Sequence, residues 1–323
     1  MDIIEGALRA GISVSAVYFC LAAIGLNVQF GYAGLLNFGQ AAFLAVGAYG
    51  FAVAVASFDM PFFVAIAIGL TCSALLALLL GIPTLRLRAD YLAIATIAAG
   101  EVVRLFVGAT NKDLFHGRDG VSGFTQAFQS VNPYDGPFLG FRPGDLWVMT
   151  VGWALVILST VLVWLLMRSP WGRVMKAIRE DEDAVRSLGK NVYSYKMQAL
   201  VLGGLIGCLG GFVLAFGQNS VQPDNFNADL TFIVYTMLIL GGAARVIGPI
   251  FGAVVFWSFL SLVGGILSKL TSGDDPFIPS WIMTGNQVGS VRFMLVGIAL
   301  MVLMIYRPQG VFGNRKEIAL DAR

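Results

Sequence analysis

Long runs of apolar residues, separated by shorter polar stretches, occupy most of this 323-residue chain. A helix needs about 20 mostly apolar residues to cross the hydrocarbon core of a bilayer. The pattern predicts segments of that kind at 7–27, 35–58, 62–82, 91–109, 147–167, 197–218, 230–246, 247–268 and 290–306. The predicted fold is an all-α membrane protein, a polytopic helical bundle of about eight to ten transmembrane segments. We expect one transmembrane domain over residues 1–323.

Lysine and arginine positions predict how the segments are oriented, because cytoplasmic loops of membrane proteins are enriched in both. Seven of the 21 basic residues lie in the loop 168–196, and others lie in the turn 83–90 and in the C-terminal tail. If these parts are cytoplasmic, the C-terminus is cytoplasmic too. The two long polar interruptions, 110–146 and 269–289, are then external loops.

The topology of the first 58 residues stays open at this stage. If 7–27 and 35–58 are simple crossings, the N-terminus is external, whereas a segment 25–58 that enters and returns makes it cytoplasmic. Broken backbone at membrane depth is tolerated only where it lines a cavity or is buried in protein. The crowded polar and small residues here indicate either a short interfacial turn or a broken or re-entrant element along a substrate pathway. The pathway candidates are Asn27, Gln29, Tyr32, Asn37 and Gln40.

Composition supports the membrane assignment and narrows the chemistry. Hydrophobic residues make up 57% of the chain and charged residues 12%, against about 25% charged in soluble domains. A net charge of +2, with basic residues beside apolar runs, gives no indication of nucleic-acid binding. The three cysteines lie far apart in apolar stretches, and one histidine, His116, cannot build a metal site alone.

Glycines at regular spacing predict close helix packing. Gly203, Gly207 and Gly211 repeat every four residues, which lets helix backbones approach one another. A second group around Gly241 and Gly248 suits a tight junction between two helices.

Few charged residues lie inside the predicted spans. Glu101 and Arg104 stand three apart on one helix face, near the external end of 91–109. An ionisable residue in a membrane segment is a functional candidate, so we include Glu101 in the pathway set. An internal ion pair with a purely structural role is the alternative.

The chain offers no recognisable nucleotide site. Its only Gly-Lys pair, Gly189–Lys190, is followed by Asn191 where a P-loop requires serine or threonine. We therefore expect no ATPase site and no cofactor in this chain, and any ATP would be bound by a partner. A catalytic role is not expected.

The charged loop 168–196 has the pattern of a docking element. Pro170 suits the first turn of a short helix, and an apolar face follows on Val174, Ile178 and Val185. An amphipathic helix that ends at a glycine can insert into a groove on a partner. A simple positive-inside anchor explains the basic residues but leaves the acidic run 180–183 unexplained. The proposed docking residues are Arg179, Glu180, Asp181, Glu182, Asp183, Ala184, Leu188 and Gly189.

Five stretches, in order along nearly the whole chain, resemble the permease subunits of branched-chain amino-acid ABC importers. They are GLNVQFGYAGLLNFGQAAFLAVGAY (25–49), LRLRADYLAIATIAAGEVVRL (85–105), SPWGRVMKAIREDEDAVRSLGKNVYSYK (169–196), LGGAARVIGPIFGA (240–253) and RPQGVFG (307–313). RLRADY and the long loop after it are more similar to the M-type (LivM) permeases than to their shorter H-type companions.

The resemblance implies partners and a location. It implies pairing with a homologous LivH-like permease, two ABC ATPase subunits and an extracytoplasmic solute-binding protein, in the bacterial plasma (inner) membrane. It also implies that the stretch Arg179 to Gly189 is the coupling helix that contacts the ATPase.

Some features leave alternatives open. The stretch 116–120 and Ala243-Ala244-Arg245 depart from the family's usual residues, and related permeases carry urea or short amides. A secondary transporter driven by an ion gradient is an alternative of a different class, but it would need a titratable cluster at mid-membrane. The sequence offers Glu101 and Arg104 near one edge.

Overall fold

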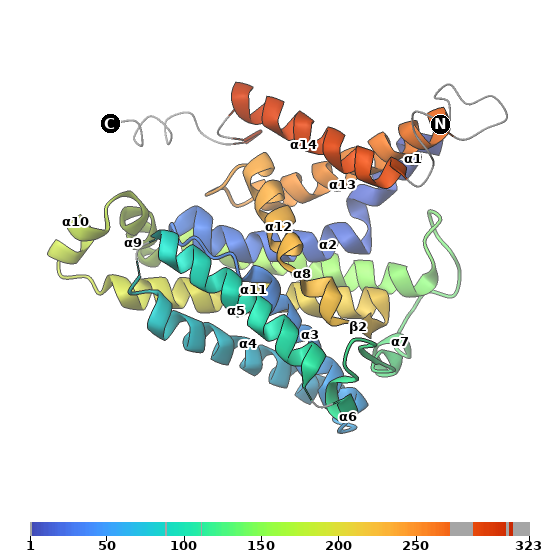
Figure 1. Ribbon diagram of the computed structural model, residues 1–323, viewed down its shortest axis with the longest axis horizontal. Helices are drawn as coiled ribbons and strands as arrows, with labels where there is room; N and C mark the ends of the chain where they lie inside the picture. The colour runs from blue at the N-terminus through green and yellow to red at the C-terminus, as the bar shows by residue number, and fades with distance from the viewer. Residues whose placement is uncertain (1, 88, 111, 272–286, 308–309, 313–323) are drawn as a thin grey trace.

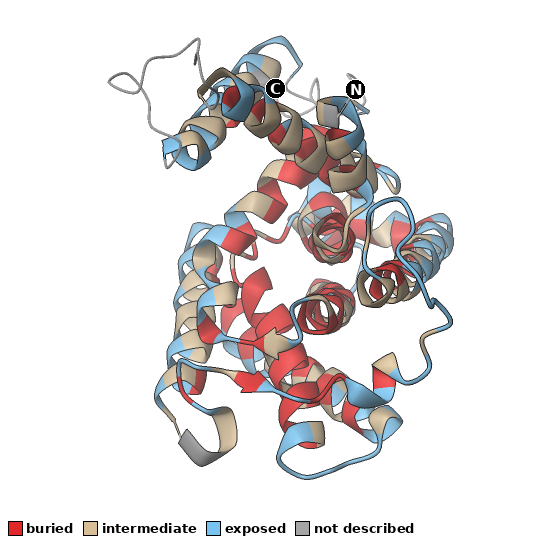
Figure 2. Ribbon diagram, turned by 90° about the vertical axis from the view of Figure 1, so that its right-hand side faces the viewer, coloured by how far each residue is buried: buried red, intermediate tan, exposed pale blue. Residues whose placement is uncertain are grey.

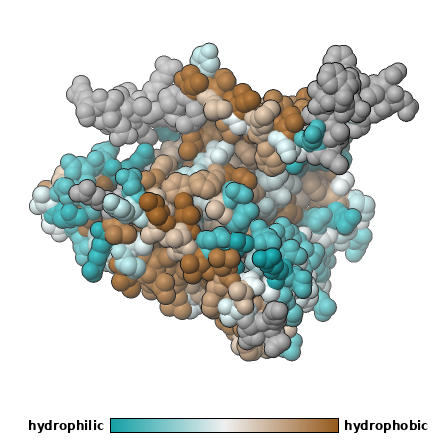
Figure 3. Space-filling view, viewed as in Figure 1, coloured by the Kyte–Doolittle hydropathy of each residue, from teal (hydrophilic) through white to brown (hydrophobic). Residues whose placement is uncertain are grey.

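The computed structural model describes residues 2–87, 89–110, 112–271, 287–307 and 310–312, most of them in helices (Figure 1). The longer helices run between two hydrophilic ends, with hydrophobic residues across the middle (Figure 3). The long helices are α1 (Asp2–Ile12), α2 (Val14–Leu26), α3 (Gln40–Ala56), α4 (Phe62–Thr84), α5 (Ala89–Ala109), α8 (Pro143–Arg168), α9 (Pro170–Glu180), α11 (Val192–Gln218), α12 (Ala228–Gly241), α13 (Gly248–Thr271) and α14 (Val288–Tyr306). The short elements are a π-helix η1 (Asn27–Tyr32), α6 (Lys112–Phe115), β1 (Val121–Ser122), α7 (Gln126–Gln129), α10 (Glu182–Ser187), β2 (Ser220–Val221) and a 3-10 helix η2 (Pro223–Phe226).

The predicted fold class is confirmed. Within the described residues, six helices are long and apolar enough to cross a membrane, and three shorter apolar helices, α3, α12 and α14, accompany them. These nine helices match the nine predicted segments. One boundary was wrong: 7–27 is not one helix, because the chain breaks at Ser13. The Ser13 hydroxyl caps the start of α2 by accepting from the Ala16 amide.

The most buried helices stand at the centre of the bundle. In α2 with η1, and in α11, 78% of the most apolar stretch is buried, against 17% in α5 and 28% in α4. Buried residues accordingly gather in the middle of the bundle (Figure 2). We infer that the exposed apolar side chains of α4 and α5 face lipid, because an apolar side chain needs no polar partner in hydrocarbon.

Glycines allow the central helices to touch backbone to backbone, as predicted. A Cβ on Gly203 would lie 2.4 Å from the Gly25 carbonyl oxygen, and one on Gly211 would lie 2.2 Å from that of Leu44. The α12–α13 junction is as tight, because a Cβ on Gly252 would lie 1.9 Å from the Met237 carbonyl oxygen. No side chain larger than glycine fits at these contacts.

The two ends of the bundle differ in the segments they carry. The helices α9 and α10 lie at one end, together with Arg86, whose guanidinium stacks on the Tyr193 ring. The amide of Phe312 donates to the Gly241 carbonyl at the same end. At the other end, β1 pairs antiparallel with β2, and Gly140 packs against the Arg9 guanidinium. Arg86, the segment 168–196 and Phe312 therefore lie on one side of the bundle, and the cytoplasmic location of that side stays a prediction. Most of the predicted loop 269–289 lies outside the described residues.

The N-terminal ambiguity is resolved by the path of the chain. The helix α2 and η1 together run from the α7 side to the α9 side, residues 33–39 return irregularly into the bundle, and α3 completes the return. Both segments are thus crossings, and the second is broken. The N-terminus lies on the same side as the loop 110–146. We call residues 27–39 the broken segment.

Replacing Gly203 by alanine should destabilise the protein by about 1–3 kcal/mol, because neither backbone at the contact can move away from the added methyl. The matched control is Gly297→Ala on α14, where no atom lies within 4 Å of the added Cβ. The midpoint of thermal unfolding of the purified chain in detergent measures both. Equal midpoints for the two variants would contradict the backbone contact.

Candidate functional site

The segment 168–196 folds into two short helices joined at a sharp bend. The first, α9, buries Gly172, Met175 and Ile178 on one face and exposes its charged residues on the other. The bend is at Asp181, whose backbone is extended (φ −153°). Beyond it, α10 buries only Val185. The helix and the apolar face expected here are confirmed, and the bend divides the element in two.

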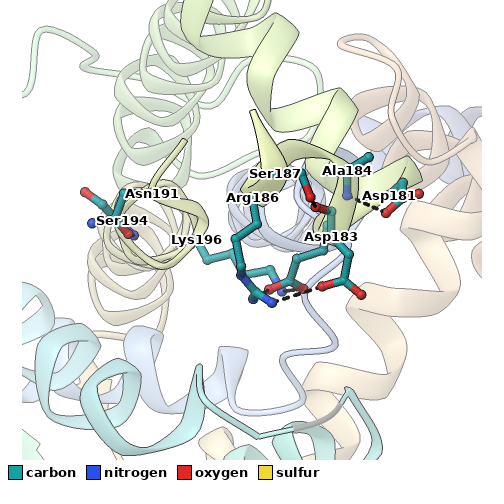
Figure 4. Close-up of polar contacts among 9 residues, drawn as sticks. Asp181, Asp183, Ala184, Arg186, Ser187, Asn191, Ser194 and Lys196 are labelled. Atoms are coloured by element: carbon teal, nitrogen blue, oxygen red, sulfur yellow. Dashed lines mark hydrogen bonds and ion pairs between the residues drawn. The ribbon is translucent and has the colours of Figure 1, made fainter. Parts of the chain in front are cut away.

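Local side-chain contacts fix the shape of α10 (Figure 4). The Asp181 carboxylate accepts from the Ala184 amide at 2.9 Å and so caps the first turn. Gly189 follows the helix with φ +75°, a left-handed conformation that glycine adopts without strain. The Asn191 side chain then accepts from the Ser194 amide at 3.1 Å and caps α11. The acidic run thus contributes a helix cap as well as surface charge.

Glu182 holds α10 against α11. Its carboxylate accepts from Arg186 at 2.8 Å and from Lys196, which lies on α11. Arg186 also donates to Asp183 at 3.0 Å. Lys196 is the least exposed member of the group, so its ion pair with Glu182 is the strongest candidate for an anchor.

The outer surface of α10 combines one large apolar side chain with small and acidic residues. Leu188 is 80% exposed at the end of the helix, beside exposed Ala184 and Gly189. Exposed carboxylates of Glu180, Asp181 and Asp183 surround these small and apolar residues. Covering Leu188 with a partner would remove apolar surface from water and so favour binding there.

One bond connects α9 to the broken segment. The Arg179 guanidinium donates to the Gly31 carbonyl oxygen at 2.5 Å, and its aliphatic part packs on Gly34. Gly31 lies in the π-helix, a rare form of helix that occurs frequently at functional sites. Sequence reasoning selected both regions but gave no signal of this contact.

The Asn27 side chain forms two hydrogen bonds with the turn between α12 and α13. Its amide nitrogen donates to the Arg245 carbonyl at 2.8 Å, and its amide oxygen accepts from the Ala244 amide at 2.9 Å. Ala244 has a φ of +60°, so the two bonds hold a turn that an L-residue rarely adopts.

The other pathway candidates lie in the same buried network. Gln29 donates to the Leu200 carbonyl at 3.1 Å and accepts from Asn37 at 2.7 Å. Gln40 reaches the carbonyl oxygens of Ala22 and Gly203. All three side chains are at most 1% exposed. These amides brace the broken segment, and direct contact with a solute stays a prediction for them. Tyr32, in contrast, lines a cavity on the α9 side.

Three further residues complete the network and were not selected from the sequence. The Thr96 hydroxyl accepts from the Phe38 amide, and the Thr231 hydroxyl accepts from the Ala41 amide, each at 3.0 Å. The Tyr235 hydroxyl donates to the Asn37 carbonyl at 3.0 Å. Single threonines and tyrosines in apolar helices carry no pattern that would have marked them.

Glu101 belongs to an ion-pair cluster near the opposite end. The Arg104 guanidinium donates to both oxygens of Glu101, at 2.5 and 3.0 Å, and to Asp224 of η2 at 3.0 Å. This arrangement ties α5 to η2 across the loop region. It matches the structural alternative, while a pathway role for Glu101 stays a prediction.

An apolar cavity of about 500 Å³ lies between α3, α4 and α5. Val53, Cys72, Val103 and Phe106 contribute to its walls, and Tyr49 is its polar member. The Tyr49 hydroxyl is buried and has no hydrogen-bond partner within the described residues. In that same part of the chain, no group of three or more His, Cys, Asp or Glu side chains could hold a metal ion.

Two tyrosine substitutions should have different effects on stability. Tyr235→Phe removes a hydrogen bond to the broken segment and should cost about 1 kcal/mol or more. Tyr49→Phe removes a hydroxyl without a partner and should leave stability unchanged or raise it. Thermal unfolding in detergent compares the two. A larger loss for Tyr49→Phe would mean that the Tyr49 hydroxyl is bonded.

Comparison with known proteins places this geometry in a family. Residues 8–305 match the family described as branched-chain amino acid transport system / permease component. The LivM permease of Salmonella typhimurium is 30% identical over 93% of this chain and 69% of its own length. A probable LivM of Methanocaldococcus jannaschii is 25% identical over 93% and 92%. The fructose import permease FrcC of Rhizobium meliloti is 30% identical, but over only 37% of this chain and 34% of its own length. The chain therefore belongs to the family of branched-chain amino-acid transport permeases.

Proposed function

We propose that this chain is the transmembrane subunit of an ABC importer that carries branched-chain or other hydrophobic amino acids across the bacterial plasma (inner) membrane. Family membership supports the permease role. The single observation that carries the ABC mechanism is the α9–α10 segment, a capped, ion-paired projection with exposed Leu188 at its tip. Such a projection fits a groove on an ATPase, which would bind ATP in place of this chain.

The family also supports a set of partners and an orientation. We propose a homologous LivH-like permease, two ABC ATPases and an extracytoplasmic solute-binding protein as the other subunits. The α9 side carries Arg86, Arg245 and the segment 168–196, so the positive-inside rule makes it cytoplasmic. The C-terminus is then cytoplasmic, and the loop 110–146 faces the solute-binding protein.

Movement of α9 would reach the membrane through Arg179. Closure of the ATPases would displace α10, and α9 would transmit the displacement to the Gly31 carbonyl. The broken segment responds as a unit, because the Asn27, Gln29 and Asn37 bonds join it to α11 and α12. This is a continuous route of contacts from α10 to the centre of the bundle.

The shape and polarity of one cavity favour a solute with an apolar side chain. The cavity at Tyr49, apolar except for one hydroxyl, suits an apolar side chain. Urea or a short amide, the alternative cargo, has little apolar surface to place there. Two relatives are named for the import of other solutes, fructose and autoinducer 2, so family membership alone does not specify the cargo.

Purification from the native membrane should recover two ATPases and a second permease with this chain. Leu188→Asp should remove the ATPases and keep the permease, because a buried carboxylate at that contact is costly. The matched control is Val131→Asp, which introduces the same charge at an exposed residue on the opposite side. Recovery of a homo-oligomer without an ATPase would exclude the importer and favour ion-coupled transport.

Arg179→Gln should uncouple the transporter. ATP hydrolysis by the reconstituted complex should persist, while leucine uptake should fall about tenfold or more, since a charge-assisted bond of about 1.5–3 kcal/mol is lost. Arg173→Gln on the exposed face of α9 is the control and should retain uptake.

Competition experiments on the same reconstituted complex test the cargo. If isoleucine and valine compete with leucine for uptake, the proposed cargo is supported. Competition by urea or acetamide instead would favour the alternative, and equal loss of hydrolysis and uptake would contradict the uncoupling.

A further inference from the structure

A second cavity, of about 420 Å³, lies on the α9 side where α8 ends and α13 begins. Its polar wall consists of three cations, Arg168, Lys176 and Arg245, and no acidic side chain lines it. The three come from different elements: the end of α8, the middle of α9 and the α12–α13 turn. Folding, not sequence proximity, has brought them together.

These cations form no ion pair with any residue that the structure describes. Within the part of the protein that the structure describes, no carboxylate oxygen lies within 4.0 Å of any of the three. Lys196 and Arg186, in contrast, are both paired with Glu182. Like charges around one cavity repel each other, and a bound anion removes that repulsion.

The cavity also lies at the membrane surface. Trp164, 4.0 Å below the Arg168 guanidinium, lies one turn inside the end of α8, and tryptophan is enriched at the membrane–water interface. Ile247 lines the same cavity and is 66% exposed. An anion that fits here therefore meets cations on the water side and apolar side chains on the lipid side.

We propose that this cavity binds the phosphate headgroup of an anionic phospholipid from the leaflet on the α9 side. Arginine and lysine donate charge-assisted hydrogen bonds to phosphate oxygens, and basic pockets of this kind between membrane helices favour such lipids. The acyl chains extend along the exposed apolar surface of Trp164 and Ile247. The site adjoins the predicted solute route at Tyr32, but the proposal does not depend on which solute is carried.

The lipid would join the parts that move during coupling. Lys176 is on α9, and Arg245 is in the α12–α13 turn, which is hydrogen-bonded to Asn27. Tyr32, at the end of the π-helix, lines the same cavity. A headgroup bound across them holds α9, the α12–α13 turn and the broken segment in one arrangement.

Native mass spectrometry of the purified complex tests the site, with phosphatidylglycerol and phosphatidylcholine of identical acyl chains as probes. Phosphatidylglycerol should be retained selectively. Each nearby cation contributes roughly fivefold to binding of an anionic lipid, so Arg168→Gln/Lys176→Gln/Arg245→Gln should weaken retention by about 100-fold. The control Arg118→Gln/Arg142→Gln/Lys269→Gln removes the same charge on the opposite side and should change it little. Arg168→Lys/Arg245→Lys keeps the charge and should keep the lipid.

Three results would overturn the proposal. Equal retention of both lipids by the unsubstituted complex would show that no headgroup is selected, whether or not the triple variant folds. Displacement of phosphatidylglycerol by millimolar inorganic phosphate would indicate a site for free anions. Loss of another subunit from the triple variant, with the lipid still bound, would show that the three cations form a protein interface.

Discussion

Backbone N–H and C=O groups at membrane depth need hydrogen-bond partners within the protein. The broken segment 27–39 has many such groups without helical partners. Residues 33–39 leave the helical hydrogen-bond pattern, and most of them are buried or half-buried in the bundle. Side chains supply the missing partners: the Phe38 amide donates to Thr96, and the Gly39 amide donates to Asn37. The tight packing of α2, α3 and α11 follows from the same requirement, because short amide side chains reach a neighbouring backbone only when helices nearly touch.

The glycines and the amides therefore act together. Gly25 and Gly203 bring α2 and α11 into backbone contact, and Gln29 and Gln40 then reach carbonyl oxygens across the interface. The result is a stiff centre surrounded by looser helices such as α5. A centre of this kind transmits displacement well, since packed interfaces respond in discrete steps and not by gradual deformation.

The connection between the centre and the α9–α10 segment has a different character. Within α10, Asp181 and Glu182 fix the local shape through a cap and ion pairs. Toward the membrane, the Arg179 guanidinium donates to the Gly31 carbonyl, and its aliphatic part packs on Gly34. Several hydrogen bonds thus hold the broken segment to α11 and α12, and this charge-assisted hydrogen bond connects it to α9. A replaceable bond at that position allows the two parts to change their relative position without unfolding either.

The sequence by itself determined the membrane class, the nine apolar helices and the helical, amphipathic character of 168–196. These properties depend on local hydropathy and charge, which a linear sequence contains in full. It also marked Asn27, Gln29, Asn37 and Gln40, because polar residues are rare in such surroundings, but it did not show what they touch. Only the tertiary structure decided that Asn27 accepts a hydrogen bond from the Ala244 amide, 217 residues away, and that Gln29 donates one to the Leu200 carbonyl, 171 residues away. Those bonds depend on how the helices pack in space. The type of a residue does not determine which distant backbone carbonyl lies beside it after folding.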